Sequence, residues 1–142
     1  MSDTQIPTPL RREVIRRAGN CCEYCRLSQE DNYFTFHVDH IISEKHQGAT
    51  TSDNLCLSCP ACNIAKGSDI AGADPISGQA IFLYHPRRQQ WADHFELVGG
   101  KIQGKTAEGR LTVQLLQLNS EDRLIEREGL IELGRYPCIS ND

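Results

Sequence analysis

Apolar residues recur at helical spacing near the start of the chain, at Leu10, Val14, Ile15 and Ala18. This pattern predicts a helix that opens at Thr8-Pro9, with threonine as the N-cap, and ends at Gly19-Asn20. Its other face carries four arginines, of which Arg12 and Arg16 lie one turn apart. These two are the better candidates for contacting a phosphate backbone, and a merely solvated face is the alternative.

The following segments predict the order strand, loop, strand, helix. Residues 33–38 are aromatic and β-branched, which predicts a strand that runs on into Asp39-His40. Residues 43–53 have no periodicity and are rich in Ser, Thr and Asp, as loops are. A second strand at 55–58 is followed by a short helix at 60–66, which begins with proline and is ended by a glycine.

The second half of the chain predicts a hairpin and two helices. Residues 68–78 are rich in Gly, Ala, Asp and Pro and are expected to form a connection. The predicted strands are 81–84, 95–98 and 101–103, and leucines at helical spacing predict helices within 109–118 and 121–133. We therefore expect a single α+β domain over residues 1–142, with a core unit at 10–67 and an extension at 80–142 packed on it.

Composition fits an ordinary globular protein. The chain has 142 residues, of which 39% are hydrophobic and 24% charged, and its longest apolar run is only Ala80 to Tyr84. This excludes a transmembrane helix, and the first twenty residues do not resemble a secretory signal, so a cytoplasmic location is expected. The formal net charge of −4 argues against a protein that coats nucleic acid indiscriminately, although it allows a local basic face.

Seven cysteines are the most informative feature of the composition. Four of them form two C-x2-C pairs, Cys22/Cys25 and Cys59/Cys62, separated by 33 residues. Two such pairs can turn four thiolates toward one ion, so the spacing predicts a tetrahedral structural zinc site. The remaining Cys21, Cys56 and Cys138 have no partner at this spacing and are expected to pack as small apolar residues, because a reducing compartment disfavours disulfides.

Aspartate, histidine and asparagine residues that could take part in catalysis lie between and beside the two cysteine pairs. Together with the cysteines they resemble the HNH endonuclease family, and the resemblance covers roughly residues 10–67. The matching positions are Cys22-x2-Cys25, Asp39-His40-Ile41-Ile42, Gly48, Asn54-Leu55, Cys59-x2-Cys62-Asn63 and Lys66-Gly67. The resemblance implies a ββα-metal nuclease that hydrolyses phosphodiester bonds in DNA.

The chemistry of these residues agrees with that expectation. His40 suits a general base because imidazole titrates near neutral pH, and Asp39 with Asn63 offers the oxygen ligands that Mg²⁺ or Mn²⁺ prefers. Asn54 is expected to hold the two ends of the loop together by hydrogen bonds. Because Asn63 stands where the family name has its last histidine, the chain is an H-N-N variant.

The predicted strand sets a geometric condition on how Asp39 and His40 can act together. Neighbouring residues in a regular strand point to opposite faces, so the strand must bend or end at Asp39-His40 if both are to reach one phosphate. Lys66 lies on the helical face of Asn63 and is expected to contact a neighbouring phosphate, although a lysine at a helix end is favoured by the dipole alone. His37 is a weaker candidate for the same role, against plain packing.

The extension offers further candidates for contact and for packing. Arg87, Arg88 and Arg110 are expected to add phosphate contacts, whereas the aromatic cluster around Trp91 is expected to be a packed corner. Two other functions remain open at this point. One is a non-catalytic zinc-knuckle module that binds nucleic acid or protein, and the other is a nuclease acting on RNA.

Overall fold

Three separate antiparallel strand pairs make up the β structure of the computed structural model, which describes residues 6–139. In chain order the helices and strands are α1 (Thr8–Ala18), β1 (His37–His40), β2 (Leu55–Ser58), α2 (Pro60–Lys66), β3 (Ala71–Ala73), β4 (Ala80–Phe82), α3 (Trp91–His94), β5 (Phe95–Val98), β6 (Lys101–Gly104), α4 (Ala107–Leu115) and α5 (Glu121–Glu132). Within residues 6–139 no helix is long and apolar enough to cross a membrane.

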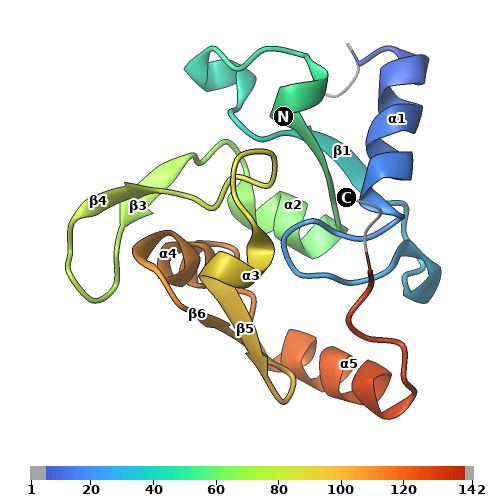
Figure 1. Cartoon of the computed structure of the whole chain (residues 1–142), viewed down its shortest axis with the longest axis vertical. Helices are drawn as coiled ribbons and strands as arrows, with labels where there is room; N and C mark the ends of the chain where they lie inside the picture. The colour runs from blue at the N-terminus through green and yellow to red at the C-terminus, as the bar shows by residue number, and fades with distance from the viewer. Residues whose placement is uncertain (1–5, 140–142) are drawn as a thin grey trace.

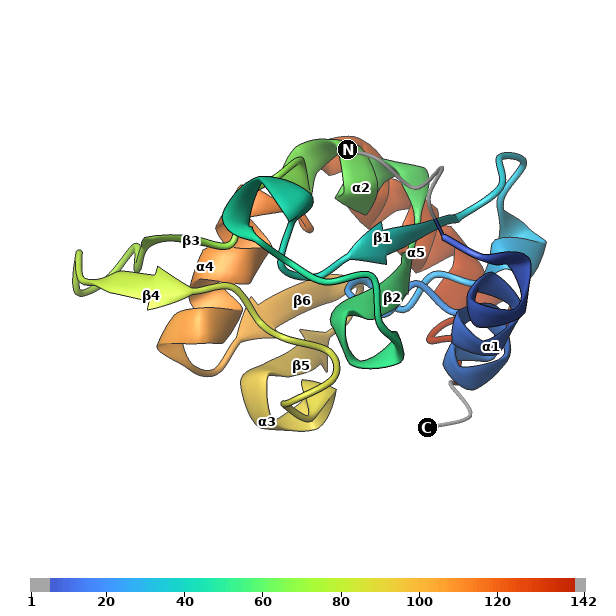
Figure 2. The ribbon, with the colours of Figure 1, turned by 90° about the horizontal axis from the view of Figure 1, so that it is seen from above.

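The first strand pair carries the predicted strand, loop, strand, helix order. β1 pairs with β2 so that Asp39 lies opposite Cys56 and His40 opposite Leu55. Helix α1 packs beside this pair, and α2 follows directly from β2 (Figures 1 and 2). Val14 of α1 and Leu55 of β2 are both fully buried in the shared core.

The predicted strand at residues 33–38 is mostly wrong, because β1 begins only at His37. Local hydrogen bonds use the backbone groups that a ladder would need: the Asn32 side chain accepts from Phe34 N, and Gln29 Nε2 donates to Phe34 O. Tyr33 is 94% exposed, so its aromatic character reflects no core position. The helix α1 also starts one residue before expectation, with Pro7 rather than Thr8 as its N-cap.

The predicted connection at residues 68–78 contains a strand, β3, that its amino-acid composition did not indicate. β3 pairs with β4, and the hairpin lies against α4, where a Cβ on Gly72 would come within 3.0 Å of Leu111 Cδ1. A larger residue here would require the leucine side chain to shift, and small residues such as this glycine give no strand signal. Strands β5 and β6, and helices α4 and α5, lie close to their predicted positions.

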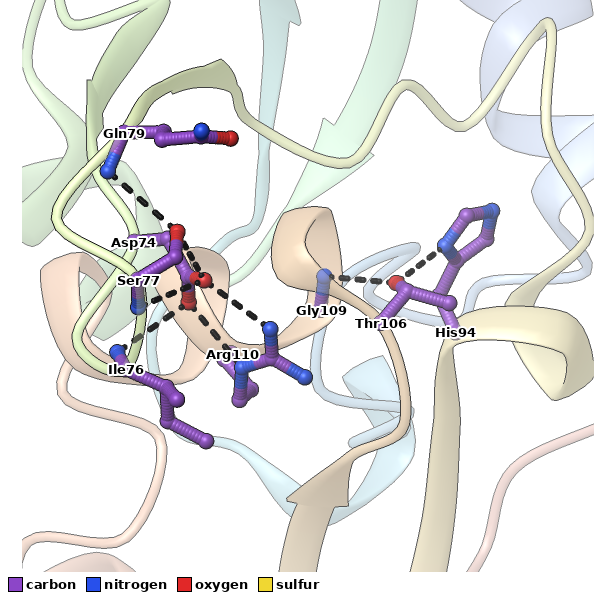
Figure 3. Close-up of polar contacts among 8 residues, drawn as sticks. All are labelled: Asp74, Ile76, Ser77, Gln79, His94, Thr106, Gly109 and Arg110. Atoms are coloured by element: carbon purple, nitrogen blue, oxygen red, sulfur yellow. Dashed lines mark hydrogen bonds and ion pairs between the residues drawn. The ribbon is translucent and has the colours of Figure 1, made fainter.

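Asp74 fastens the β3–β4 hairpin to α4 (Figure 3). Its carboxylate accepts hydrogen bonds from Arg110 Nε and Nη2, both at 2.9 Å, and from Ser77 N and Oγ. The Arg110 guanidinium holds the pKa of the Asp74 carboxyl well below its usual range. Arg110 is therefore engaged within the fold, so its predicted phosphate contact is not supported.

A disulfide between Cys21 and Cys138 joins the segment after α1 to the C-terminal segment of the described chain. The expectation that these two cysteines pack separately is wrong, because residues 117 positions apart in sequence become neighbours only in the fold. Tyr136 Oη reinforces the contact by donating to Cys25 O at 2.6 Å. Cys56 remains a free, buried thiol, as predicted. The C-terminal segment thus returns from α5 to the base of α1 (Figure 1).

Candidate metal centre and active site

The four cysteines of the two C-x2-C pairs meet in one buried cluster. The Sγ atoms of Cys22, Cys25, Cys59 and Cys62 all lie within 4.8 Å of one another. Backbone amides support the sulfurs: Cys25 N donates to Cys22 Sγ at 3.5 Å, and Cys62 N donates to Cys59 Sγ at 3.4 Å. Four convergent thiols of this kind could hold a tetrahedral metal ion. Cys59 is also the N-cap of α2, so the cluster fixes the start of that helix.

Asp39 is the next-to-last residue of β1, and its side chain contacts the backbone of the residue that follows it. Its Oδ1 accepts from His40 N at 2.9 Å, while Oδ2 is buried and has no hydrogen-bond partner among the described residues. Burial raises the pKa of this carboxyl, and the nearby Lys66 ammonium opposes the rise. Because β1 ends at His40, the predicted end of the strand at this dipeptide is observed.

His40 is buried and held by a residue that the sequence did not single out. Its Nε2 lies 2.9 Å from Thr50 Oγ1, across the loop between β1 and β2. Thr50 lies in a loop without periodicity, so only the fold shows that it meets the histidine. This contact fixes the plane of the imidazole ring.

Asn54 makes the hydrogen bonds that were expected across the same loop. Its Nδ2 donates to Ile42 O at 3.0 Å and to Ala49 O at 2.8 Å, and its Oδ1 accepts from Ile42 N at 2.9 Å. Arg17 also stabilises this loop, because its guanidinium donates to Ser52 Oγ at 2.8 Å and to a backbone carbonyl of β2. Arg17 therefore stabilises the loop and is not part of the exposed arginine face.

Asn63 is buried on α2, directly after Cys62. Its Oδ1 is buried and, like Asp39 Oδ2, has no hydrogen-bond partner among the described residues. Unpaired buried oxygens are rare because losing the hydrogen bonds of water is costly. Since β1 and α2 contact each other, two such oxygens arise on adjacent elements, and each is of the kind that a hard cation takes as a ligand.

A surface cavity of about 220 Å³ opens at the end of β1. Its lining comes from β1, the start of the following loop and the end of α2, namely Asp39, His40, Ser43, Glu44, Lys45, Gly67 and Ser68. The candidate base and the candidate carboxylate ligand thus line the same opening.

Lys66 lies elsewhere than its predicted role requires. It is only 2% exposed, and its Nζ donates to His40 O at 3.3 Å. The ammonium thus supports the backbone behind the active site, and a direct contact with a phosphate does not fit this burial. The sequence could not show this, because the helical spacing gives the face of α2 but not what covers it.

The other predicted contact residues divide into exposed and engaged groups. Arg12 is exposed on α1, and Arg16 is exposed beside Glu13, with its Nη2 3.9 Å from that carboxylate. His37 is half-buried at the start of β1. Arg87 forms a buried ion pair with Glu23, so it is engaged within the fold, contrary to expectation.

The aromatic residues of the extension form the predicted packed corner. The rings of Trp91 and Phe95 lie 5.0 Å apart, and Trp91 Nε1 donates to Tyr24 O at 2.8 Å. Tyr24 lies inside the first C-x2-C pair, so this corner braces the cysteine cluster.

Comparisons with known proteins agree with the geometry. The chain is 28% identical over 126 residues to the Septu protein PtuB of Bacillus thuringiensis, an alignment that covers 86% of this chain and 46% of that protein. The chain thus spans about half the length of this relative. No solved structure matches the chain. The sequence model of the HNH endonuclease family matches residues 22–69, which include both C-x2-C pairs and the Asp39-His40 dipeptide. Residues 22–69 are therefore an HNH endonuclease domain.

Proposed function

We propose that this protein is a metal-dependent endonuclease that hydrolyses phosphodiester bonds in DNA, with His40 as general base. The observation that carries the proposal is a pair of buried oxygens without a hydrogen-bond partner among the described residues. Asp39 Oδ2 lies on β1, the strand that also carries His40, and Asn63 Oδ1 lies on α2, which contacts that strand. A protein that only binds nucleic acid gains nothing from unsatisfied buried oxygens, because they destabilise the fold. This favours a nuclease over the non-catalytic zinc-knuckle module.

Asp39 and Asn63 are the residues that would hold a catalytic Mg²⁺ or Mn²⁺. Both supply hard oxygen ligands, and two protein ligands leave positions for water and for phosphate oxygens of the substrate. When bound, such a cation neutralises charge on the scissile phosphate and on the departing oxygen. The Asp39 Oδ1 is already committed to His40 N, so Oδ2 is the ligand atom that this arrangement offers.

His40 would remove the proton from the attacking water. If the Nε2 hydrogen is donated to Thr50 Oγ1, the lone pair of Nδ1 remains available to accept that proton. Lys66 holds the histidine in place by donating to the His40 carbonyl. Asn54 holds the loop that follows the histidine by donating to Ile42 O. They are positioning residues in this account and do not contact the substrate.

The four-cysteine cluster would hold a structural Zn²⁺. Its sulfurs are buried, and all four protein ligands are present, which is typical of a closed structural site without a free coordination position. The ion would fix the start of α2 through Cys59 and Cys62, and so the position of Asn63. Neighbouring residues of this short helix would thus be ligands of two different metal ions.

DNA would approach the opening that His40 and Asp39 line. Arg12 and Arg16 on the exposed face of α1 are the basic side chains proposed to contact the phosphate backbone, with His37 as a further candidate. The domain organisation implied is one unit, with the nuclease core at 10–67 and the extension at 80–142 supporting it.

Plasmid cleavage tests the proposal. The purified protein should nick or linearise supercoiled plasmid with Mg²⁺ or Mn²⁺ and not with added EDTA, and His40→Ala should lower the rate by about 10²–10⁴-fold while the protein stays folded. RNA of the same sequence, assayed in parallel, tests the preference for DNA. Cleavage by His40→Ala at the wild-type rate would refute the assignment of the base.

A further inference from the structure

Helix α5 combines a half-buried apolar contact with buried polar ones, since Leu130 packs against the core and the most buried side chain of the helix is charged. Its one fully buried residue is Arg127, which donates to Gly100 O at 2.7 Å and to Leu118 O at 2.6 Å. Ile125, by contrast, is 61% exposed. Polar contacts of the buried arginine therefore contribute to the position of α5 beside this apolar packing.

Arg123, one turn before Arg127, contacts the sulfurs of the four-cysteine cluster. Its Nη2 lies 3.0 Å from Cys62 Sγ and 3.9 Å from Cys59 Sγ, and its Nη1 donates to Leu116 O at 2.8 Å. The guanidinium thus bridges the end of α4 and the sulfurs that begin α2. Within residues 6–139 no carboxylate lies at ion-pair distance from Arg123, although Glu126 on the same helix interacts with it electrostatically, so the sulfurs are the acidic groups that it contacts directly.

The chemistry of a four-thiolate site explains why an arginine is suited to this place. Four thiolates around one divalent cation leave two excess negative charges, and the cluster is buried, where such charge is expensive. A guanidinium that donates to a thiolate sulfur offsets part of this charge and limits the movement of the ligand. Arginine suits the role because its fork can bind a sulfur and a backbone carbonyl at once.

We propose that Arg123 is an outer-sphere positioning residue of the four-cysteine metal site, and that metal occupancy and the docking of α5 stabilise each other. This inference rests on the proposed Zn²⁺ in that site. It gives the C-terminal segment a role: through Arg123 and Cys62, α5 supports the helix that carries Asn63. By linkage, whatever favours bound zinc must also favour docked α5, and the reverse.

Zinc affinity and the exposure of α5 test the two halves of this inference. In the full-length protein, Arg123→Gln should lower zinc affinity by about 10–100-fold, measured by competition with a chromophoric chelator, and Arg123→Lys should lower it less. Arg135→Gln is the matched control, because Arg135 is an exposed arginine that pairs with Asp31 at 2.9 Å and contacts no sulfur. It should keep wild-type affinity.

Hydrogen exchange measures the reciprocal effect. Zinc removal should strongly raise amide exchange across residues 121–132 in the wild-type protein, and the effect should be small in Arg123→Gln, whose helix is already loose. Cobalt substitution adds a signature of the contact itself: the thiolate-to-cobalt absorption band should shift in Arg123→Gln and not in Arg135→Gln. A merely structural arginine would leave this band unchanged.

The outcomes separate this inference from the proposed zinc site. If the wild type binds zinc and Arg123→Gln binds it equally tightly with an unshifted cobalt band, the inference is wrong and the zinc site stands. If the wild type binds no zinc, both fail. If Arg123→Gln does not fold, Arg123→Lys decides, since wild-type zinc affinity in that variant refutes the need for the arginine fork and a reduced affinity supports it.

Discussion

The hydroxyl oxygen of Thr50 lies 2.9 Å from Nε2 of His40, although the two residues are 10 positions apart in sequence. Asn54 holds the loop closed through Ile42 O and Ala49 O, the carbonyl of the residue before Thr50. The loop between β1 and β2 is therefore built around the imidazole. This arrangement gives the histidine one ring orientation before any substrate is bound.

Thr50→Val should lower the rate of plasmid cleavage because it removes the oxygen that orients His40 and keeps the size of the side chain. We expect a loss of about tenfold, smaller than the loss for His40→Ala, because the base itself remains. Thr50→Ser is the control that restores the hydroxyl, and it should cleave near the wild-type rate. Equal rates for all three proteins would show that the hydrogen bond is unimportant.

Lys66→Met should lower the stability of the protein and leave its affinity for DNA unchanged. Lys66 is buried and bonded to His40 O, so its loss should cost about 1–3 kcal/mol of unfolding free energy. Arg12→Gln should leave stability unchanged and weaken DNA binding. The slope of log K against log[salt] should become smaller in magnitude by about 1. Thermal melts and binding titrations in a His40→Ala background compare the two. Weakened DNA binding by Lys66→Met at unchanged stability would restore the phosphate role.

The ion pair of Asp74 with Arg110 should make stability depend on pH in the acidic range. Because Arg110 lowers the pKa of Asp74 in the folded state, the stabilisation is fully present above the ordinary carboxyl pKa of about 3.9. It is lost as the pH falls through the lower, folded-state value. The melting temperature of Asp74→Asn should therefore lie below wild type by on the order of a few degrees at pH 7. The difference should shrink in strong acid, and a gap independent of pH would contradict this.

The disulfide between Cys21 and Cys138 should be detectable as one bond that survives purification without reductant. Because it closes a loop over most of the chain, Cys138→Ser should cost about 2–4 kcal/mol of stability. Mass spectrometry of unreduced peptides identifies the bond, and melts with and without reductant measure its effect. Two free thiols at these positions in the unreduced protein would contradict the pairing.

The parts of the fold that could be predicted are those with local signals. The helix around Val14 has a repeating apolar stripe and a terminal glycine, and the second strand and α2 are bounded by a loop and a proline. The C-x2-C spacing predicted that four cysteines meet. The helix and strand signals each lie within a short stretch of sequence, and the cysteine signal consists of two such short stretches with the same spacing, which is why they could be recognised.

The parts that could not be predicted depend on long-range contacts. Thr50, Arg123 and the Cys21–Cys138 pair have ordinary neighbours in sequence, and only the fold brings them to their partners. For Lys66, the helical face was predicted from the sequence but the burial of the side chain was not. Spacing along the chain gives the direction of a side chain but not what lies opposite it.

Cys62 and Asn63 are neighbours on α2, and the proposed function assigns them to two different metal ions. Asn63→Ala removes an oxygen ligand of the proposed hard cation but no thiolate, so cleavage should fall sharply while zinc content and melting temperature stay near wild type. Cys62→Ser, one residue away, should lose zinc and stability first, with activity declining as a consequence.

The most direct test is the zinc content of Asn63→Ala, measured by elemental analysis on the same sample as its cleavage rate with Mg²⁺. We predict wild-type zinc with a strongly reduced rate. Loss of zinc in Asn63→Ala equal to that in Cys62→Ser would contradict the account, because Asn63 would then belong to the structural site or the core.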